Sequence, residues 1–225
     1  TTIGDHTFRD CSKLTGIRMG KAITSIGKYA FSGCTQLREL AIPEKVITLG
    51  EGAFASCQSL ESITIPVGLN HAISTSHTTA LFEGATLSQF YGCSALTSVT
   101  IKVPSINAGF TAWIDNDLLK TNAITEIILA EGVDDIGDGT FKDKASLERV
   151  ILPINASRIG SAAFQNCTGL KEISIGRGTA SIAGNAFDGC KNLSAINIAA
   201  GNTAYTSKEG LLFNKSGEIL LKCPE

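Results

Sequence analysis

A segment of 23 residues recurs along this chain and constrains its fold more than any other feature. Residues 26–43 follow the pattern I-G-x-x-A-F-x-x-C-x-x-L-x-x-L-x-I-P, and residues 159–175 repeat it. Successive positions of the repeat phenylalanine are 23, 23, 36, 28, 23, 23 and 23 residues apart. Two of these steps are longer than the period, one by 13 residues and one by 5. We therefore predict about eight coils with two insertions, whose column residues are Phe8, Phe31, Phe54, Phe90, Leu118, Phe141, Phe164 and Phe187.

Each part of the repeat has a local structural meaning. The alternating L-x-I end is typical of a short strand with one buried face, and proline often follows it, as at Pro43, Pro66 and Pro153. The A-F-x-x-C-x-x-L part has a spacing of three, which favours one or two turns of helix or 3₁₀-helix. A single coil cannot bury its apolar face, whereas stacked coils bury a continuous column of Phe, Cys, Leu and Ile.

These features predict an α/β fold: a right-handed solenoid with a parallel sheet on one face. We expect one domain over residues 1–225, with regular coils at 1–66, coils carrying the insertions at 67–118, regular coils at 119–198 and a C-terminal cap at 199–225. The cap should be a β-hairpin of residues 210–213 and 218–221 around the turn 214–217. The first coil has a weak strand, I-R-M-G, and no dedicated cap precedes Thr1. Because the chain starts without Met, we expect a mature or trimmed product, with membership of a longer protein as an open alternative.

Six of the seven cysteines occupy one repeat position: Cys11, Cys34, Cys57, Cys93, Cys167 and Cys190. We interpret them as buried, reduced thiols that act as small apolar side chains. Disulfides between neighbouring coils are the alternative, because coils about 4.8 Å apart fall within the Cα separation of a disulfide. The clustered spacing of a zinc site does not occur, so we predict no metal and no cofactor. Cys223 lies outside the ladder and is the candidate reactive thiol.

Composition and motifs point away from several functions. The net charge is −2, which gives no electrostatic reason to expect nucleic-acid binding. No apolar run approaches the roughly 18 residues of a membrane span. Hydrolase, metalloprotease, phosphate-loop and dinucleotide motifs are absent from the sequence, and three histidines are few for acid–base chemistry. We therefore predict that the chain is not an enzyme.

Solenoids bind along the sheet face, so the outward strand positions are the candidate contacts. Most are small or hydroxylated, apart from Ile128 and Ile151 on adjacent coils, which form an apolar patch beside charged neighbours. Those charges either pair across the strands or form a polar rim. The insertions are a second candidate, since long excursions on a rigid scaffold often bind; metal ligation by the two histidines there is the weaker interpretation. The predicted partner-binding residues are Arg18, Glu39, Thr64, Thr100, Lys102, Glu126, Ile128, Arg149, Ile151, Glu172, Trp113, His71 and His77.

The repeat pattern and its period of 23 resemble the BspA-like class of leucine-rich repeats over nearly the whole chain. The ending N-x-x-Y-x-S-x-x-G-L-L-F-N-K, residues 202–215, is also similar to the terminal element of that family. The resemblance implies a cell-surface or extracellular, largely bacterial protein that mediates adhesion to a host, matrix or other surface protein, without catalysis. The alternative is a structural spacer within a longer surface-anchored repeat protein. We expect a monomer.

Overall fold

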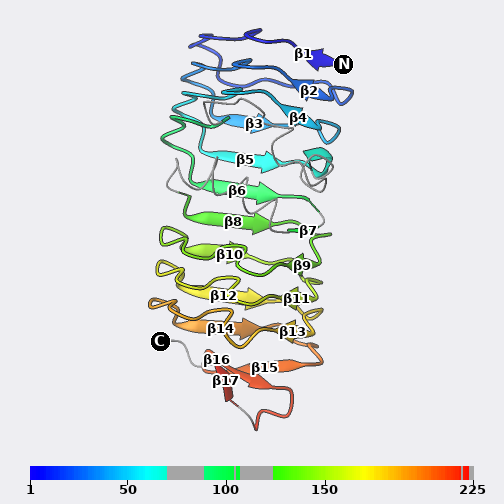
Figure 1. Ribbon diagram of the computed structural model, residues 1–225, viewed down its shortest axis with the longest axis vertical. Coiled ribbons are helices and arrows are strands. Elements are labelled where there is room, and N and C mark those ends of the chain that lie inside the picture. Colours follow the sequence, from blue (N-terminus) through cyan, green and yellow to red (C-terminus); the bar gives the residue numbers. More distant parts are fainter. Residues whose placement is uncertain (70–88, 104, 107–123, 219, 223–225) are drawn as a thin grey trace. The chain divides into compact units, whose positions relative to one another are not determined.

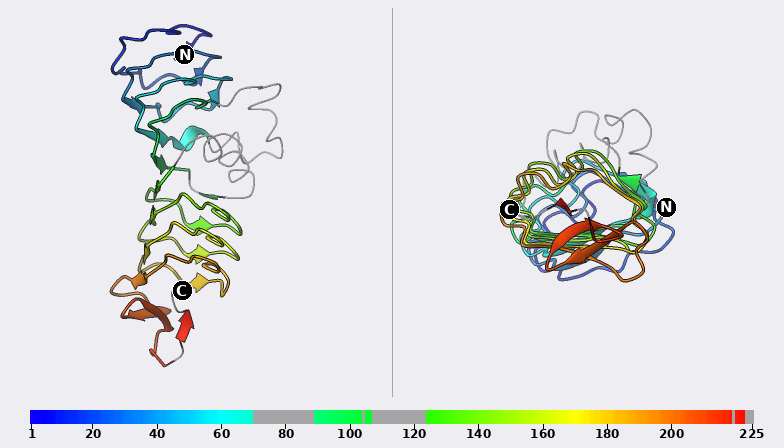
Figure 2. Two further views of the ribbon diagram at one scale, coloured as in Figure 1. Left: turned by 90° about the vertical axis from the view of Figure 1, so that its left-hand side faces the viewer. Right: turned by 90° about the horizontal axis from the view of Figure 1, so that it is seen from below.

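The computed structural model describes residues 1–69, 89–103, 105–106, 124–218 and 220–222. They fall into two compact units, built mainly from residues 1–103 and 125–225, and each is described by itself. In both units short strands of successive coils lie side by side (Figure 1), and the coils follow one another as layers (Figure 2). The parallel-sheet solenoid predicted from the repeat is confirmed. The prediction of one domain stays a prediction.

The first unit contains two parallel sheets on different sides of its coils. One consists of β1 (Thr2–Ile3), β2 (Ser25–Ile26) and β4 (Thr48–Leu49), and the other of β3 (Glu39–Ala41), β5 (Ser62–Ile65) and β6 (Ser98–Ile101). Strand partners are one repeat period apart except between β5 and β6, where Ile63 pairs with Val99 across the first insertion. The register inferred from the phenylalanines is therefore the register of the strands.

The second unit repeats this arrangement. Its larger sheet has the order β8 (Glu126–Leu129), β10 (Arg149–Ile151), β12 (Glu172–Ile175) and β14 (Ala195–Ile198). Its smaller sheet has the order β7 (Ser105–Ile106), β9 (Asp135–Ile136), β11 (Arg158–Ile159) and β13 (Ser181–Ile182). In each long strand the inward residue is buried, as Ile127 and Ile173 are at 1% exposed, and it alternates with residues that point outward.

The predicted phenylalanine column is confirmed in both units. Phe8, Phe31, Phe54 and Phe90 stack with ring centroids 5.0–5.5 Å apart, and Phe141, Phe164 and Phe187 stack at 5.4–5.5 Å. The interior members are completely buried. Aromatic pairs at this separation contribute about 0.5–1.5 kcal/mol beyond the burial of their area. Leu118, the eighth predicted column residue, lies outside the described residues.

The segment around each phenylalanine is a run of turns and not a helix. The described residues contain one 3₁₀ turn, η1 (Val67–Leu69), and no α-helix. Around Phe31 the residues two before and two after, Tyr29 and Gly33, have positive φ angles of 52° and 78°, and the residue two after every described phenylalanine of the column has a positive φ as well. This alternation turns the N–H groups of residues 29, 31 and 33 towards the next coil, where they donate to Glu51, Ala53 and Ala55 at 2.7–2.8 Å. Coil-to-coil bonding therefore replaces the i→i−4 bonds of a helix.

The cysteines behave as the apolar interpretation predicts, with one exception. Five are free and buried, and each Sγ donates to the carbonyl of the previous coil's phenylalanine at 2.9–3.2 Å, as Cys57 does to Phe31. No disulfide joins the described cysteines. Cys11 is exposed, because no described coil covers the outer side of its coil. Cys223 lies outside the described residues.

The predicted hairpin is confirmed as part of a three-stranded antiparallel sheet of β15 (Tyr205–Lys208), β16 (Leu211–Asn214) and β17 (Leu220–Lys222). Asn202 anchors this cap. Its side chain is 1% exposed, donates to the carbonyls of Gly176 and Thr179 at 2.9 Å, and accepts from the N–H groups of residues 204 and 205 at 2.8 Å. All four hydrogen bonds of the amide are made, which a buried amide requires.

Candidate functional site

The sheet face of the first unit carries two outward rows with small and hydroxylated side chains. In one row Glu39 of β3 lies beside Ser62 of β5, which lies beside Ser98 of β6. In the other row the order is Ala41, Thr64 and Thr100. The predicted residues Glu39, Thr64 and Thr100 are thus outward and neighbouring, because alternate residues of a strand share a face. Short side chains leave the strand backbones of this face thinly covered.

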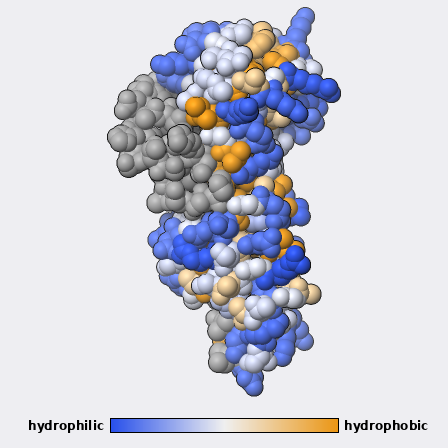
Figure 3. Space-filling view, turned by 90° about the vertical axis from the view of Figure 1, so that its right-hand side faces the viewer, coloured by the Kyte–Doolittle hydropathy of each residue, from blue (hydrophilic) through white to orange (hydrophobic). Residues whose placement is uncertain are grey.

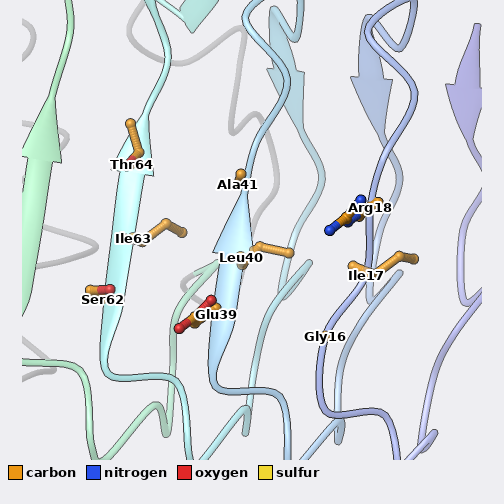
Figure 4. A pocket seen from close by; sticks show the side chains of 9 residues that line it. All are labelled: Gly16, Ile17, Arg18, Glu39, Leu40, Ala41, Ser62, Ile63 and Thr64. Carbon is orange, nitrogen blue, oxygen red and sulfur yellow. The ribbon is translucent and has the colours of Figure 1, made fainter.

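A shallow hollow of about 570 Å³ lies at the start of this face, over β3, β5 and residues 16–18. Figure 4 shows the Arg18 side chain extending towards β3 and the Glu39 side chain towards β5. The first coil forms no strand here, since Gly16 makes a single bridge to Glu39. Arg18 and Glu39 are both exposed, so this hollow offers a cation, an anion and hydroxyl groups to a polar ligand.

Lys102 follows β6 and makes an ion pair with Glu44, 2.7 Å between Nζ and Oε1. The other carboxylate oxygen of Glu44 accepts the N–H of Val67 at 3.4 Å. The hydrogen bond from Lys102 lowers the pKa of Glu44 below its ordinary value. The Lys102 ammonium is therefore partnered within the chain. A partner protein would have to compete with Glu44 for it.

The second unit places the predicted charged residues in one row. Arg149 lies between Glu126 and Glu172 in the register of β8, β10 and β12. Its Nη1 is 3.1 Å from Glu126 Oε1, so these two form a cross-strand ion pair. Because the Arg149 side chain is 63% exposed, the pair contributes about 0–1 kcal/mol. Of the two interpretations of these charges, pairing across strands is confirmed for Arg149 and Glu126.

The two predicted outward isoleucines lie directly beside each other, since Ile151 of β10 pairs with Ile128 of β8. Both are partly exposed. In the same row Ser174 of β12 follows Ile151, and Asn197 of β14 follows Ser174. The apolar pair therefore lies beside the charged row of Glu126, Arg149 and Glu172. Along its own row it is followed by the polar residues Ser174 and Asn197.

A charge cluster on the smaller sheet of this unit was not predicted. Arg158 donates through Nε and Nη2 to the two carboxylate oxygens of Asp135 at 2.8 and 3.2 Å, and through Nη1 to Asp138 at 2.9 Å. The pKa of Arg158 is raised, first by the hydrogen bond to Asp135, and the pKa of Asp138 is lowered by Arg158. Asp135 and Arg158 are one repeat period apart, and this spacing is the feature of the sequence that indicates their pairing on neighbouring strands.

The buried thiols are poorly suited to nucleophilic chemistry. Burial raises the pKa of Cys34 to about 11 and that of Cys167 to about 12, and the hydrogen bond with Cys93, together with burial, raises the pKa of Cys57. The thiolate is the reactive form, so these groups are inert at neutral pH. Among the residues that the structure describes, no three His, Cys, Asp or Glu side chains are grouped to hold a metal ion.

Apolar side chains are scattered over the surface. On the side shown in Figure 3 they form small separate groups between hydrophilic ones. The large exposed ones in the described part of the chain are Ile47, Val67, Tyr91, Ile154 and Leu220. No helix in that part has the length and hydropathy to cross a membrane. The predicted contacts Trp113, His71 and His77 lie outside the described residues.

The fold and the outward rows define a leucine-rich-repeat solenoid with an open sheet face. The family model of the BspA type leucine rich repeat region matches six copies over residues 1–112 and 86–216. The chain belongs to this family, which confirms the resemblance drawn from the repeat. The family and its fold are generally non-catalytic, and leucine-rich-repeat proteins typically mediate protein interactions.

Several solved bacterial structures are similar to this chain. A leucine rich cell surface protein from Faecalibacterium prausnitzii is 25% identical over 92% of this chain and 52% of its own, with a TM-score of 0.47. A leucine-rich repeat protein from Eubacterium ventriosum is 20% identical over 89% of this chain and 48% of its own, with a TM-score of 0.48. The pneumococcal vaccine antigen PcpA is 15% identical over 100% of this chain and 42% of its own, with a TM-score of 0.46. This chain thus spans about half the length of these proteins. No curated protein matches it.

Proposed function

We propose that this chain is a non-catalytic, adhesion-type module that binds a protein partner through its sheet face, as part of a bacterial cell-surface or secreted protein. Membership of the BspA-type family supports the class of function, and one of the similar solved structures is that of a leucine rich cell surface protein. The observation that carries the proposal is the pair Ile128 and Ile151, side by side on a face whose other outward residues are small or polar.

The composition around this pair suits a modest protein contact. The partly exposed isoleucines form an apolar centre, and Glu126, Arg149 and Glu172 supply a charged border along the neighbouring row. Interfaces commonly combine a desolvated apolar centre with a polar rim, and the centre supplies most of the affinity. The strands below it are fixed by coil-to-coil bonds, so binding orders little backbone.

The experiment is a binding screen against matrix and host-surface proteins with the variant Ile151→Asp. A buried, unpaired carboxylate at the centre of the contact should weaken binding at least tenfold. Ser174→Asp is the matched control, because it puts the same charge in the same row one strand away on an exposed position. If Ile151→Asp binds like the wild type, the partner does not use this pair.

The insertions are a second proposed contact, through Trp113, His71 and His77. Deletion of residues 70–85 tests the first insertion, and it leaves the sequence of the strands on the sheet face unchanged. If the deletion leaves the affinity for the partner unchanged, the first insertion is not a contact. If the deletion abolishes binding and Ile151→Asp does not, the binding site lies on the insertions and not on the isoleucine pair.

A structural spacer is the other candidate function. It is favoured by the internal pairing of the outward charges, since Lys102 binds Glu44 and Arg149 binds Glu126. A spacer should tolerate charge reversal over the whole sheet face, for example Arg149→Glu, with no loss of attachment of the cells that display it. Loss of attachment in such a variant would argue for the binding module.

A further inference from the structure

The charged side chains on the larger sheet of the second unit do not balance one another. The outward positions of β8, β10, β12 and β14 carry three charged residues, Glu126, Arg149 and Glu172. Two carboxylates against one guanidinium leave these outward positions with a net charge of −1. One carboxylate therefore has no counter-charge on this face.

The unbalanced carboxylate is that of Glu172. In the strand register Arg149 lies between the two carboxylates, but its Nη1 pairs with Glu126, at 3.1 Å. Lys171 precedes Glu172 in the sequence, and its ammonium pairs with Glu148, one repeat period earlier. Both neighbouring cations are thus held by other carboxylates. Glu172 is exposed, and its carboxylate has no hydrogen-bond or ion-pair partner in the described part of the chain.

This carboxylate borders the apolar pair. Ile151 pairs with Ser174, and Glu172 is two residues earlier on the same strand, so Glu172 and Ile151 are diagonal neighbours on one face. Neighbouring strands are about 4.8 Å apart and two residues span about 6.6 Å, which places the diagonal Cα atoms about 8 Å apart. On the other side of Glu172 lies Ala195 of β14, whose short side chain leaves space beside the carboxylate. One short segment of a partner could therefore contact both Ile151 and Glu172.

We propose that the partner of this face presents a basic segment, with an apolar side chain that docks on Ile128 and Ile151 and a Lys or Arg that pairs with Glu172. This inference rests on the proposed binding function and adds the charge of the partner. The desolvated isoleucines supply most of the affinity. The carboxylate steers a basic segment to the face and disfavours an acidic one, because complementary charge mainly sets specificity and the rate of association.

Two other occupants fit this face less well. Two copies of the chain that met through the patch would each bring a net charge of −1 to the contact, which opposes their association. A phosphate-bearing surface, such as an anionic lipid bilayer, would place further negative charge against Glu172.

The probe is a phage-displayed library of random linear peptides, selected on the immobilised full chain and counter-selected on the Ile151→Asp variant. The counter-selection keeps the peptides whose binding needs the isoleucine pair. We expect these peptides to carry an apolar residue and a Lys or Arg within about three positions of each other, since two to three residues of extended chain span the distance of about 8 Å between the two contacts.

A selected peptide is then titrated against variants of the full chain. Glu172→Gln should weaken its binding by about threefold or more at about 50 mM salt, which is the effect of one exposed ion pair. The difference from the wild type should shrink at about 500 mM salt, where exposed charges are screened. Glu39→Gln is the matched control, because Glu39 is exposed at the same repeat position but has Ala41 in the place of the isoleucine; it should leave the affinity unchanged. Glu172→Lys should abolish the preference for the basic peptide, and exchange of the peptide's Lys for Glu should restore binding to that variant.

Several results would overturn the inference. If the Ile151-dependent peptides lack basic residues, or if Glu172→Gln binds them like the wild type at low salt, the carboxylate does not select the partner, and the proposed binding function stands without it. A dimer in sedimentation, or binding to phosphatidylglycerol vesicles, that Ile151→Asp abolishes would assign the patch to a second copy or to a membrane surface. If no Ile151-dependent peptide emerges, the isoleucine pair is not a docking surface, and this inference fails together with the contact on which it rests.

Discussion

Removal of one ring from the middle of the phenylalanine column is the most direct perturbation of this fold. Phe164 is 0% exposed and lies between Phe141 at 5.4 Å and Phe187 at 5.5 Å. Phe164→Ala loses about 2–3 kcal/mol of burial, about 0.5–1.5 kcal/mol for each of two aromatic contacts, and leaves a cavity. Because these effects overlap, we expect a loss of about 3–5 kcal/mol in the free energy of unfolding.

Phe8 supplies the matched control. It occupies the same repeat position, but it has one ring neighbour, Phe31 at 5.0 Å, and is already partly exposed. Phe8→Ala loses one aromatic contact and creates an open notch instead of an enclosed cavity. We therefore expect a loss of about 1–2 kcal/mol in the free energy of unfolding, which is smaller than the loss for Phe164→Ala.

Urea unfolding followed by circular dichroism measures both variants, and native-state hydrogen exchange reports whether the second unit opens separately. The slope of unfolding against urea must be unchanged for the midpoints to give free energies. Equal losses for the two variants would refute the stacked column as the source of stability. A loss below about 1 kcal/mol for Phe164→Ala would do the same.

Three further predictions concern other parts of the coils. Asn202→Ala should lower the free energy of unfolding by about 2–4 kcal/mol in a urea titration, because it strands two carbonyls and two N–H groups beneath the cap. Gly189→Ala should lower the thermal midpoint more than Asn166→Ala, because φ at 189 is 74° and a Cβ there would lie 2.2 Å from Asn166 Oδ1. The contribution of Cys34 and Cys167 to stability should be constant below about pH 9 and fall as pH rises towards 11, because their thiols ionise first in the unfolded chain and stay protonated in the fold. Replacement of both by Ala should make the free energy of unfolding, measured by urea titration, fall less steeply over that range.

The sequence predicted the column because the period leaves little freedom. Once Phe31, Phe54 and their equivalents recur with a constant period, stacking in register is the arrangement that buries all of them. The cysteine ladder followed by the same reasoning. The outward positions of the strands followed too, because alternate residues share a face.

Other features had a sequence signal that was not used. The residue two after each phenylalanine is Asp10, Gly33, Ser56, Gly92, Asp143, Asn166 or Gly189, and each has a positive φ. Small, Asn, Asp and Gly residues tolerate this conformation, so the pattern indicates a turn where the spacing of three suggested a helix. The cap was predicted as a hairpin, whereas the hydroxyls of Tyr205 and Ser207 that close the strand edges could be assigned only in three dimensions.

By itself, the sequence determined the period, the apolar column and the direction of each strand residue, because these depend on spacing along one coil. The tertiary structure decided which of the available charges pair, as Arg158 does with both Asp135 and Asp138. Each such pairing depends on which side chains of the neighbouring coil come within hydrogen-bond distance. That distance is set by how the coils stack, and not by the order of residues within one coil.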